Sequence, residues 1–506
     1  MLVGAGPGEA GLITVAGAQW LSLADTVVYD RLVNPALLKL CREDAELINV
    51  GKGGPECSVT QEEVTRLLVE NCRKNRLVVR LKGGDPLIFG RGGEEAEALE
   101  AAGIPFRIVP GVTAGAGAAA YAGIPLTDRR YASTVAFVTG HEDAAKAASS
   151  INWPALAGID TVVFYMGVAN LPAIAERLMG AGRPGTTPAA VVERGTTARQ
   201  RTVVGTLATL AGDAAKAGIR PPALVIVGGV VLLRERLAWF DRLPLFGRTV
   251  LVTRTRRQAS ELAARFGEMG AEVIEAPTIS VQPPESFEPV DAALRGLKEF
   301  DWLVLTSPNG VDAVFERMRA IGLDARALGA VRVAAVGPAT AAALDRRSVR
   351  ADLVPQEATT EALGRALLAG ESLGRKRVLL AQADLATPQL ADALTKAGAA
   401  VEEVAVYRTV RPPALAPEAI EALRGGRVDW ITFTSSSTVE NFLALTAGLG
   451  ADLEEVRLGT IGPVTAATLE SHGLTPTVVA ATHTIEGLVD AVVSYEMKVG
   501  PRGGRT

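Results

Sequence analysis

The second half of the chain is an internal duplication, which limits its possible folds more than any other feature. Four pairs of segments match at offsets of about 125 to 128 residues, and two repeats of this length are typical of two similar α/β lobes. Two lobes imply a cleft, the usual place for a small-molecule site. The matching segments are Asp301-Trp302 with Thr306-Ser307 and Asp429-Trp430 with Thr434-Ser435, Gly337–Ala342 and Gly462–Ala467, Thr360–Leu363 and Ile485–Leu488, and Gly247-Arg248 and Gly374-Arg375.

In the first half, short apolar runs alternate with helical patterns, which predicts a largely parallel sheet flanked by helices. Ligands of such sheets bind at loops beyond the carboxyl ends of the strands, where most glycine-rich segments of this half fall. A Pro and a Gly in Leu243–Gly247 precede a fresh strand at Thr249, so we expect the boundary between the halves there. The predicted strands are Thr26–Tyr29, Leu77–Leu81, Phe106–Val109, Val135–Thr139, Thr161–Tyr165 and Leu224–Val227.

The composition, 48% hydrophobic and 21% charged residues, is that of an ordinary folded protein. The net charge of −4 argues against nucleic acid as a partner, because phosphate binding normally needs a basic excess. The longest apolar run, Ala223–Leu233, is too short to span a bilayer and predicts a buried strand. No N-terminal basic and apolar signal is present, so we expect a cytoplasmic protein with no membrane partner.

Cysteine and histidine usage predicts neither disulfides nor a metal site. The three cysteines lie far apart without a CxxC pair, as reduced thiols do. The two histidines of the second half belong to no Ser/His/Asp or metal-binding pattern, and we expect them on the surface or in loops. These residues are Cys41, Cys57, Cys72, His472 and His483.

Two glycine-rich segments of the first half are candidate ligand loops. Val3–Gly8 fails the GxGxxG pattern, because Glu9 stands where the third Gly belongs, and it is either a cofactor loop or only a tight turn. Gly83-Gly84-Asp85-Pro86 follows a strand, and its glycines let backbone approach a ligand closely. Arg91, on the loop before the next helix, is suited to capturing a carboxylate, although a solvent-facing role is equally open.

Across residues 1 to about 240, the chain resembles uroporphyrinogen-III C-methyltransferase. Related precorrin methyltransferases and diphthine synthase share the early Gly-Pro-Gly, whereas the Phe-Gly-Arg-Gly-Gly-Glu-Glu and Pro-Leu-Thr segments favour the uroporphyrinogen enzyme. The resemblance implies a class III S-adenosylmethionine methyltransferase fold over 1–242, with subdomains of about 1–128 and 129–242. The matching segments are Gly4–Gly8, Tyr29–Val33, Val50–Lys52, Gly83–Glu95, Val109–Ala114, Tyr121–Thr127, Tyr165–Gly167 and Val192–Thr197.

The resemblance also implies the residues of the site. Asp30 would accept a proton, although it is otherwise a plain strand-end cap, and Lys52 would donate one. Arg91 would act in catalysis and, with Glu94, Arg129 and Met166, contact a substrate that carries eight carboxylates. The cofactor would be S-adenosylmethionine, which leaves as S-adenosylhomocysteine. Its binding site would be lined by Pro7, Gly83, Gly84, Asp85, Ile88, Thr113, Ala114, Met166 and Gly195.

One departure from the family pattern bears on this site. Asp128 stands where a His is common, just before Arg129. An acidic side chain facing a polyanionic substrate would repel it. We therefore expect Asp128 to pair with Arg129 or Arg130.

Residues of about 247 to 495 resemble uroporphyrinogen-III synthase, on the duplication together with Val406-Tyr407, Phe433–Ser436 and Gly462–Thr465. The resemblance implies a two-lobed, flavodoxin-like α/β synthase without a cofactor. The two halves fit together, because the product of one family is the substrate of the other. The predicted parts are a linker at 243–247, lobe one at 248–282 plus 410–495, lobe two at 283–409, and a tail at 496–506.

The implied synthase reaction is closure of linear hydroxymethylbilane with loss of hydroxide and inversion of the last ring. Tyr407 could assist the leaving hydroxide by hydrogen bonding, or it is only a half-buried aromatic residue. Ser435, Ser436 and Thr465 are candidates to bind substrate carboxylates, while Val464 replaces a Thr common in the family.

Together, the resemblances predict a bifunctional enzyme of tetrapyrrole biosynthesis that makes uroporphyrinogen III and methylates it twice to precorrin-2. We expect a homodimer formed through the methyltransferase half. Two alternatives stay open: the first half could methylate a later precorrin, and the second could be a non-catalytic two-lobed binding module. The sequence does not show whether the product serves sirohaem, haem or cobalamin.

Overall fold

The computed structural model describes residues 1–51, 59–74, 76–140, 150–254, 256–370, 372–384, 386, 388–450 and 453–500. The chain divides into two compact units. The first consists of Met1–Val250, Arg265–Val273 and Val493–Thr506, and the second of Leu251–Ala264 and Ile274–Val492. The described residues form four five-stranded sheets, and each is flanked by helices.

The first sheet has the strand order β3-β2-β4-β1-β5, and all of its pairs are parallel, as predicted. The ends of β4 and β5 differ from the predicted runs by one or two residues, and β2 agrees with its run. The short strand expected at the start of the chain is β1, whereas β3 was not predicted. The strands are β1 (Leu2–Gly4), β2 (Thr26–Tyr29), β3 (Glu46–Asn49), β4 (Val78–Lys82) and β5 (Ile108–Val109).

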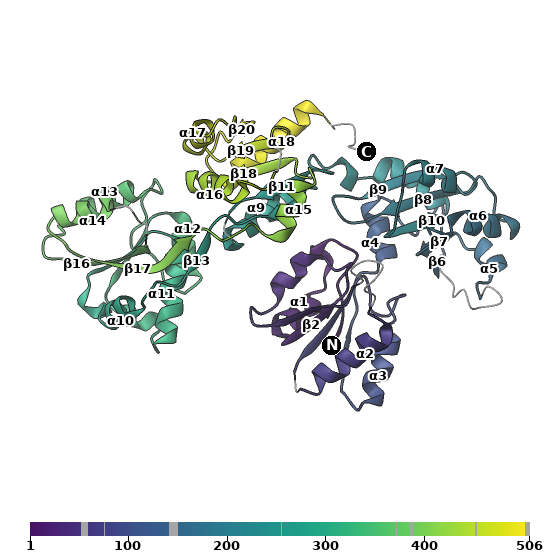
Figure 1. Cartoon of the computed structure of the whole chain (residues 1–506), viewed down its shortest axis with the longest axis horizontal. Coiled ribbons are helices and arrows are strands. Elements are labelled where there is room, and N and C mark those ends of the chain that lie inside the picture. The colour runs from purple at the N-terminus through teal and green to yellow at the C-terminus, as the bar shows by residue number, and fades with distance from the viewer. Residues whose placement is uncertain are drawn as a thin grey trace. The chain divides into compact units, whose positions relative to one another are not determined.

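Alternate side chains of these strands enter two different cores. Val27 and Val79 pack on the face that α1 (Val15–Leu23) covers, whereas Val28 and Val78 pack on the opposite face with α2 (Gln61–Cys72). Figure 1 shows α1 and α2 on either side of β2. Because side chains alternate along a strand, every second residue of β4 points toward α2 and α3 (Gly92–Ala101).

The second sheet, of order β6-β7-β10-β8-β9, is mixed rather than parallel. Only β6 and β7 run parallel, and the other three pairs are antiparallel. The prediction of a largely parallel sheet is therefore wrong for this part, because β8 and β9 form a hairpin and β10 inserts between β7 and β8. The strands are β6 (Val135–Thr139), β7 (Thr161–Tyr165), β8 (Pro188–Glu193), β9 (Arg201–Thr206) and β10 (Ala223–Val227).

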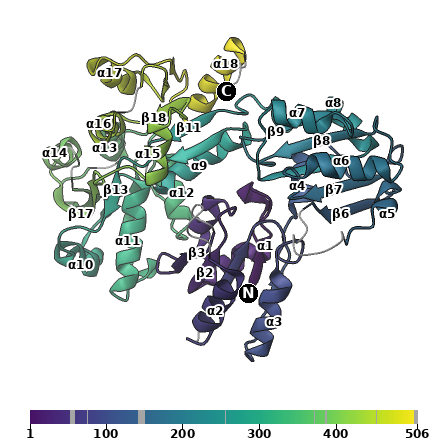
Figure 2. The same cartoon turned by 45° about the vertical axis from the view of Figure 1, so that its right-hand side comes forward.

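Helices cover both faces of the second sheet. Residues of α5, α6 and α7 pack on one face, and the small residues of α4 pack on the other with η3. Figure 2 shows α5 and α6 beside the strands of this sheet. The elements are α4 (Ala114–Tyr121), α5 (Trp153–Ala157), α6 (Leu171–Gly180), α7 (Leu210–Lys216), η3 (Gly229–Leu233) and α8 (Arg234–Leu237).

The apolar run at 223–233 is only half a strand. β10 ends at Val227, and a 3-10 helix follows from Gly229. Gly228 separates them with a φ of 156°, a conformation that a side chain would disfavour. The prediction of one buried strand is thus correct for the first five residues and wrong for the rest.

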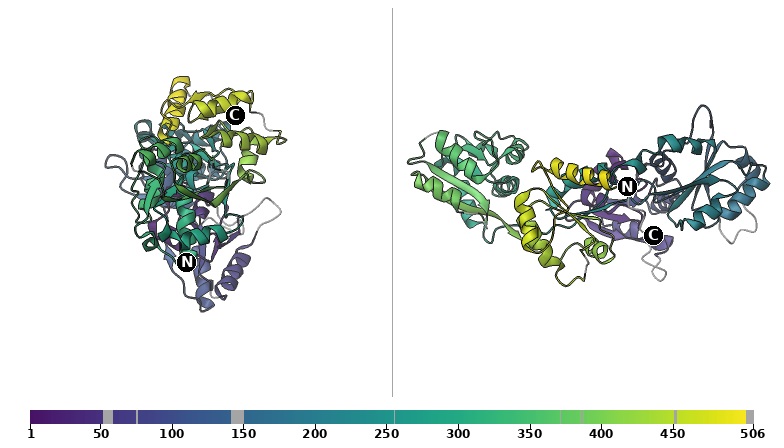
Figure 3. Two further views of the ribbon diagram at one scale, coloured as in Figure 1. Left: turned by 90° about the vertical axis from the view of Figure 1, so that its left-hand side faces the viewer. Right: turned by 90° about the horizontal axis from the view of Figure 1, so that it is seen from above.

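The other two sheets, of orders β12-β11-β18-β19-β20 and β13-β17-β16-β14-β15, are built from residues after Arg248, most of which belong to the second unit. Figure 3 shows the middle of this region, drawn in green, gathered into one lobe. The strands are β11 (Thr249–Val252), β12 (Glu272–Glu275), β13 (Ser280–Gln282), β14 (Trp302–Leu305), β15 (Arg332–Ala335), β16 (Arg377–Ala383), β17 (Ala400–Val410), β18 (Trp430–Phe433), β19 (Arg457–Thr460) and β20 (Val478–Val479). The helices are α9 (Arg256–Glu268), α10 (Glu288–Arg295), α11 (Pro308–Ala320), α12 (Pro338–Asp345), α13 (Thr360–Gly370), α14 (Gln389–Lys396), α15 (Pro417–Arg424), α16 (Ser436–Thr446), α17 (Pro463–Ser471) and α18 (Ile485–Val499).

The duplication predicted from the sequence is confirmed in local structure. Ser307 and Ser435 are equivalent N-caps, whose hydroxyls accept hydrogen bonds from backbone N–H groups of α11 and α16. The residues before α12 and α17 are both fully extended glycines, Gly337 and Gly462. Two similar lobes follow from the sequence repeat, as expected.

The first crossing between the lobes lies earlier than predicted. Ser280–Gln282 was placed in lobe one, yet it pairs antiparallel with the end of β17 in the other sheet. The crossing therefore falls between Glu275 and Ser280. The antiparallel ladder also explains why β17, at 11 residues, is longer than the other strands described.

Within the described residues, no helix is long and apolar enough to cross a membrane. In the same ranges, no group of three or more His, Cys, Asp or Glu side chains is placed to hold a metal ion. Cys41 and Cys72 are free thiols, while Cys57 lies outside the described residues.

Candidate functional site

Three loops at the carboxyl ends of β1, β4 and β5 pack against one another through glycine backbone. Gly6 and Gly84 exchange two backbone hydrogen bonds, with N···O distances of 3.2 and 2.7 Å. A Cβ on Gly111 would lie 2.2 Å from the Gly84 carbonyl oxygen and 2.7 Å from Cα of Gly4. Only glycine allows the backbones of these loops to approach so closely. The glycines that predicted a ligand loop therefore also hold the loops against one another.

Asp85 ties two of these loops together. Its Oδ1 accepts a hydrogen bond from the Leu87 N–H at 2.8 Å, and its Oδ2 accepts one from the Gly111 N–H at 3.0 Å. Both carboxylate oxygens thus hold backbone in place. Remaining lone pairs on the same oxygens can still accept from a ligand.

Tyr165, which the sequence reasoning did not select, links the two sheets of the first unit. Its hydroxyl lies 2.6 Å from the Thr113 hydroxyl and accepts a hydrogen bond from the Gly115 N–H at 2.7 Å. It therefore caps the start of α4 from β7. Burial raises the pKa of Tyr165, which keeps its phenol neutral. The matched segment Tyr165–Gly167 was the available signal for this residue.

Backbone strain gathers around the same loops. Seven described non-glycine residues have positive φ, and five of them belong to segments that follow β4, β7 and β8. Residues held in such conformations cost about 1–3 kcal/mol each and concentrate at functional sites. The five are Phe89, Arg91, Met166, Arg194 and Thr196.

Large apolar side chains are exposed on these loops. Leu32, Leu87, Phe89 and Met166 all lie among the exposed hydrophobic residues, and Met166 is 53% exposed. The Phe89 ring packs on Tyr165 with ring centroids 4.8 Å apart. Exposed apolar groups that gather in this way mark a ligand or partner surface.

Asp30 lies directly after β2 and forms an ion pair with Arg80 of β4. The distance from Oδ1 of Asp30 to Nη2 of Arg80 is 2.5 Å, and the Asp30 side chain is one third exposed. Over the described ranges, its Oδ2 accepts no hydrogen bond. Lys52, its predicted partner in proton transfer, lies outside the described residues.

The predicted substrate residues are placed differently from one another. Arg91 and Glu94 form a bidentate pair with each other, with N···O distances of 2.8 and 2.7 Å. Arg129 is exposed. Asp128 pairs with Arg130, with Nε 3.0 Å from Oδ1, which confirms the expectation that a neighbouring arginine neutralises it.

The remaining predicted cofactor residues lie on the same set of loops. Pro7 packs on α4, because a Cβ on Gly117 would meet its Cγ at 2.5 Å. Gly195 packs on Ala118 of the same helix. Ile88 and Ala114 contact the core between α4 and the second sheet.

In the second unit, Tyr407 of β17 is mostly buried, and its hydroxyl lies 3.0 Å from the Ser307 hydroxyl. Ser307 is the N-cap of α11, so Tyr407 reaches the start of a helix at the carboxyl end of β14. Burial raises the pKa of Tyr407, and its phenol stays protonated at neutral pH.

The candidates of the other lobe lie at the starts of α16 and α17. Ser435 caps α16, and the Ser436 hydroxyl accepts a hydrogen bond from Thr468 at 2.7 Å. Thr465 is only 4% exposed, whereas Val464 beside it is 75% exposed. The expectation that Thr465 faces a ligand does not fit this arrangement. Thr465 lies in the first turn of α17, and its side chain is buried in the protein.

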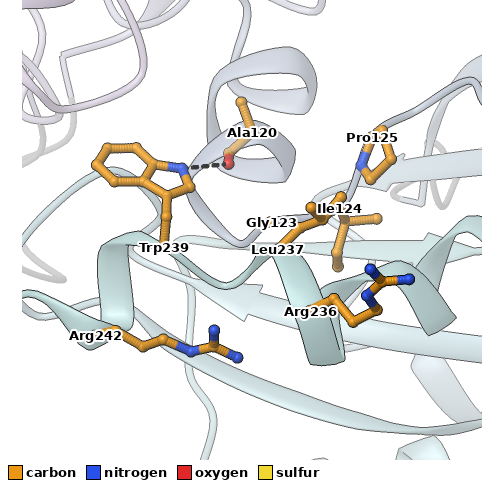
Figure 4. A pocket seen from close by; sticks show the side chains of 8 residues that line it. All are labelled: Ala120, Gly123, Ile124, Pro125, Arg236, Leu237, Trp239 and Arg242. Atoms are coloured by element: carbon orange, nitrogen blue, oxygen red, sulfur yellow. Dashed lines mark hydrogen bonds between the residues drawn. The ribbon is translucent and has the colours of Figure 1, made fainter.

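A cavity of about 510 Å³ lies at the far end of α4 from these loops. Its lining is mostly apolar, with Arg236 and Arg242 among the lining side chains, and Trp239 donates a hydrogen bond to the Ala120 carbonyl (Figure 4). None of the predicted site residues lines it.

Two family models match the chain. Residues 1–211 match "Tetrapyrrole (Corrin/Porphyrin) Methylases", and residues 260–490 match "Uroporphyrinogen-III synthase HemD". Each match falls on one of the two regions whose resemblance was inferred from motifs. The predicted fold class, a two-subdomain methyltransferase followed by a two-lobed synthase, is thereby confirmed.

Solved structures also resemble parts of the chain. The uroporphyrin-III C-methyltransferase of Thermus thermophilus, complexed with S-adenosylhomocysteine, is 40% identical and covers 46% of this chain and 98% of its own, with a TM-score of 0.40. A mutant uroporphyrinogen III synthase of Thermus thermophilus is 24% identical and covers 50% of this chain and 100% of its own, with a TM-score of 0.36.

Curated relatives cover either half or nearly all of the chain. The siroheme synthase of Pseudomonas fluorescens is 52% identical over 47% of this chain, which spans about half (52%) of that protein's length. The "Porphyrin biosynthesis protein HemD" of Ruminiclostridium josui is 38% identical over 97% of both chains. The chain therefore belongs to the family of this porphyrin biosynthesis protein, and is an enzyme of tetrapyrrole biosynthesis with a tetrapyrrole methylase domain and a uroporphyrinogen-III synthase domain.

Proposed function

We propose that the second half closes hydroxymethylbilane to uroporphyrinogen III and that the first half methylates this product twice to precorrin-2. The observation that carries the proposal is the 38% identity along 97% of both chains to a porphyrin biosynthesis protein. The order of reactions belongs to the proposal: a uroporphyrinogen-III synthase domain would supply the substrate of a tetrapyrrole methylase domain that acts on uroporphyrinogen III.

We propose that S-adenosylmethionine binds at the strained loops of the first unit. The residues fit this cofactor, because the hydrogen bonds between Gly6 and Gly84 hold the loops in place while the side chains of Leu87 and Met166 stay exposed for a ligand to cover. Exposed Met166 and the rest of the apolar surface suit its adenine ring and the flat tetrapyrrole. When bound, S-adenosylmethionine supplies an electrophilic methyl group. Pro7, Gly83, Gly84, Asp85, Ile88, Thr113, Ala114, Met166 and Gly195 would hold it.

The role of Asp30 follows from the electronics of the acceptor. A pyrrole carbon is electron-rich and needs no strong base before it attacks a methyl group. The attack leaves positive charge on the macrocycle, and a proton must then leave carbon. The carboxylate of Asp30 stabilises that charge and takes the proton through Oδ2, which accepts no hydrogen bond from the described residues. Arg91 and Arg129 bind substrate carboxylates. Arg91 leaves its ion pair with Glu94 when it binds a substrate carboxylate.

In the second half, the enzyme folds a flexible linear chain so that its ends meet in the productive order. The hydroxyl of Tyr407 donates a hydrogen bond to the departing hydroxide, while Ser307 holds that phenol in position. Ser435 and Ser436 contribute hydroxyls at the start of α16 to substrate carboxylates.

Tyr407→Phe should slow formation of uroporphyrinogen III about tenfold, because one hydrogen bond to the leaving group is lost. The fraction of type I isomer should rise, since uncatalysed closure then competes. Chromatographic separation of the two isomers after reaction with hydroxymethylbilane measures both effects. Tyr131→Phe, which alters an exposed tyrosine of the first unit, should change neither. An unchanged isomer ratio and rate in Tyr407→Phe would remove Tyr407 from the mechanism.

We also propose that the chain forms a homodimer through its methyltransferase half. Leu232, Leu237 and Trp239 are exposed apolar side chains on one short segment of that half. Such a patch is more often covered by a partner than left to water. Sedimentation of the full chain should give twice the mass of 52.6 kDa, and a monomer at micromolar concentration would contradict this proposal.

A further inference from the structure

A buried network of charges lies behind Asp30, between β4 and α3. It contains Arg80, Lys82 and Glu95, whose side chains are 5%, 3% and 0% exposed. Nζ of Lys82 lies 2.7 Å and Nε of Arg80 lies 3.2 Å from the same oxygen of Glu95, Oε1. Burying charges is costly unless each is paired, so a network of this kind needs a reason beyond stability.

Every nitrogen of the Arg80 guanidinium is engaged. Nε donates to Glu95, Nη1 donates to the carbonyl oxygens of Val28 and Leu81 at 3.4 and 3.3 Å, and Nη2 donates to Asp30. The planar fork is thus fixed by two strands and a helix before it reaches Asp30. A guanidinium held in this way presents one donor in a defined direction.

Glu95 is held through one of its two carboxylate oxygens. Its Oε1 accepts from Arg80, from Lys82 and from Gln61 Nε2 at 3.0 Å, while its Oε2 is buried and has no hydrogen-bond partner in the described ranges. An unsatisfied buried carboxylate oxygen is costly. Burial, with a contribution from the neighbouring Arg80, lowers the pKa of Lys82. These costs point to a function for the arrangement.

We propose that Arg80 is a positioning residue for methyl transfer: anchored by Glu95, it fixes one oxygen of the Asp30 carboxylate and leaves the other for the proton of the substrate. This inference rests on the proposed role of Asp30. It explains why Asp30, which would meet the substrate, is partly exposed while Arg80, Lys82 and Glu95 are buried. It also explains a charged residue inside the apolar run Val78–Leu81.

Arg80→Met removes the contact to Asp30 and leaves Glu95 paired with Lys82, so the buried charges stay balanced. We expect kcat for methyl transfer to fall about 10- to 100-fold, as for a small misplacement of a catalytic group. The affinity for S-adenosylmethionine should stay unchanged. Single-turnover methyl transfer to uroporphyrinogen III and calorimetric titration with S-adenosylmethionine measure the two quantities.

Lys82→Met is the matched control. It removes the other cation on the same oxygen of Glu95, and Lys82 acts on Asp30 only through its charge, without a hydrogen bond to it. We expect a similar loss of stability but a kcat within about threefold of the wild type, because the Arg80 to Asp30 contact survives. Equal losses of kcat in both variants would mean that the network only supports the fold, and would overturn the proposal.

The double variant Asp30→Asn/Arg80→Met separates this inference from the proposed function. If Arg80 acts through Asp30, kcat of the double variant should lie within about twofold of Asp30→Asn alone. Fully additive losses would overturn the positioning role. Wild-type turnover in Asp30→Asn would instead overturn the proposed role of Asp30. If Arg80→Met does not fold, Arg80→Lys replaces it, because one ammonium cannot span both Glu95 and Asp30.

Discussion

Asp30→Asn is expected to lower the rate of methyl transfer by about 100-fold or more, the contribution typical of a positioned acid or base. The asparagine keeps the shape of the side chain, and its Oδ1 can still accept from Nη2 of Arg80. What it loses is the negative charge that stabilises the cationic macrocycle and the site that receives the proton. The binding of S-adenosylmethionine should change little, because the proposed cofactor residues do not include Asp30. Single-turnover kinetics and calorimetry on the full chain check both statements.

A matched substitution controls for the loss of one carboxylate. Asp44 also forms an ion pair with an arginine, Arg42, but at an exposed place in the same half. Asp44→Asn should leave methyl transfer unchanged, since exposed ion pairs contribute little. Full turnover in Asp30→Asn would show that the proton goes elsewhere.

Gly111→Ala is expected to weaken the binding of S-adenosylmethionine about tenfold or more. The added Cβ would lie 2.2 Å from the Gly84 carbonyl oxygen and 2.7 Å from Cα of Gly4, so backbone must move at the junction of three loops. Overpacking of this kind costs about 1–3 kcal/mol, and here the cost falls on the loops that would hold the cofactor. Calorimetric titration measures the affinity, and thermal unfolding measures the stability.

Gly93→Ala is the control for this change. A Cβ at Gly93, in the first turn of α3, meets nothing within 4 Å. Replacing a helical glycine by alanine where there is room stabilises a protein by about 0.4–1 kcal/mol. Its affinity for S-adenosylmethionine should match that of the wild type. An unaltered affinity in Gly111→Ala would show that the junction of the loops does not shape the cofactor site.

The sequence predicted most of what local pattern determines. Glycines after an apolar run placed the Gly83–Arg91 loop at the end of a strand, and the repeated Asp-Trp and Gly-Pro segments predicted two matching lobes. The antiparallel strands of the second sheet escaped prediction, because the direction of a strand depends on partners far away in the chain. Strand ends shifted by one or two residues for the same reason.

The loops of the candidate site could be predicted from the sequence, but the residues that hold its side chains in place could not. Asp30 could be carried over from a motif, whereas Arg80 lies in an apolar run, and nothing local shows that its fork reaches both Glu95 and Asp30. Tyr165 was part of a matched segment, yet its contact with Thr113 joins two sheets that only the fold brings together. At Thr465 and Val464 the motif suggested the wrong residue for a ligand contact. The orientation of the helix decides which of two neighbours is exposed, and here it exposes Val464 and buries Thr465.

One reaction tests the central claim, that a single chain makes uroporphyrinogen III and then methylates it twice. The full chain is incubated without oxygen with hydroxymethylbilane and methyl-labelled S-adenosylmethionine, and the products are resolved by chromatography and mass spectrometry. We predict a type III macrocycle carrying two labelled methyl groups, and accumulation of unmethylated uroporphyrinogen III when Asp30→Asn replaces the wild type. A type I macrocycle alone would contradict the synthase half, and uroporphyrinogen III without label from the wild type would contradict the methyltransferase half.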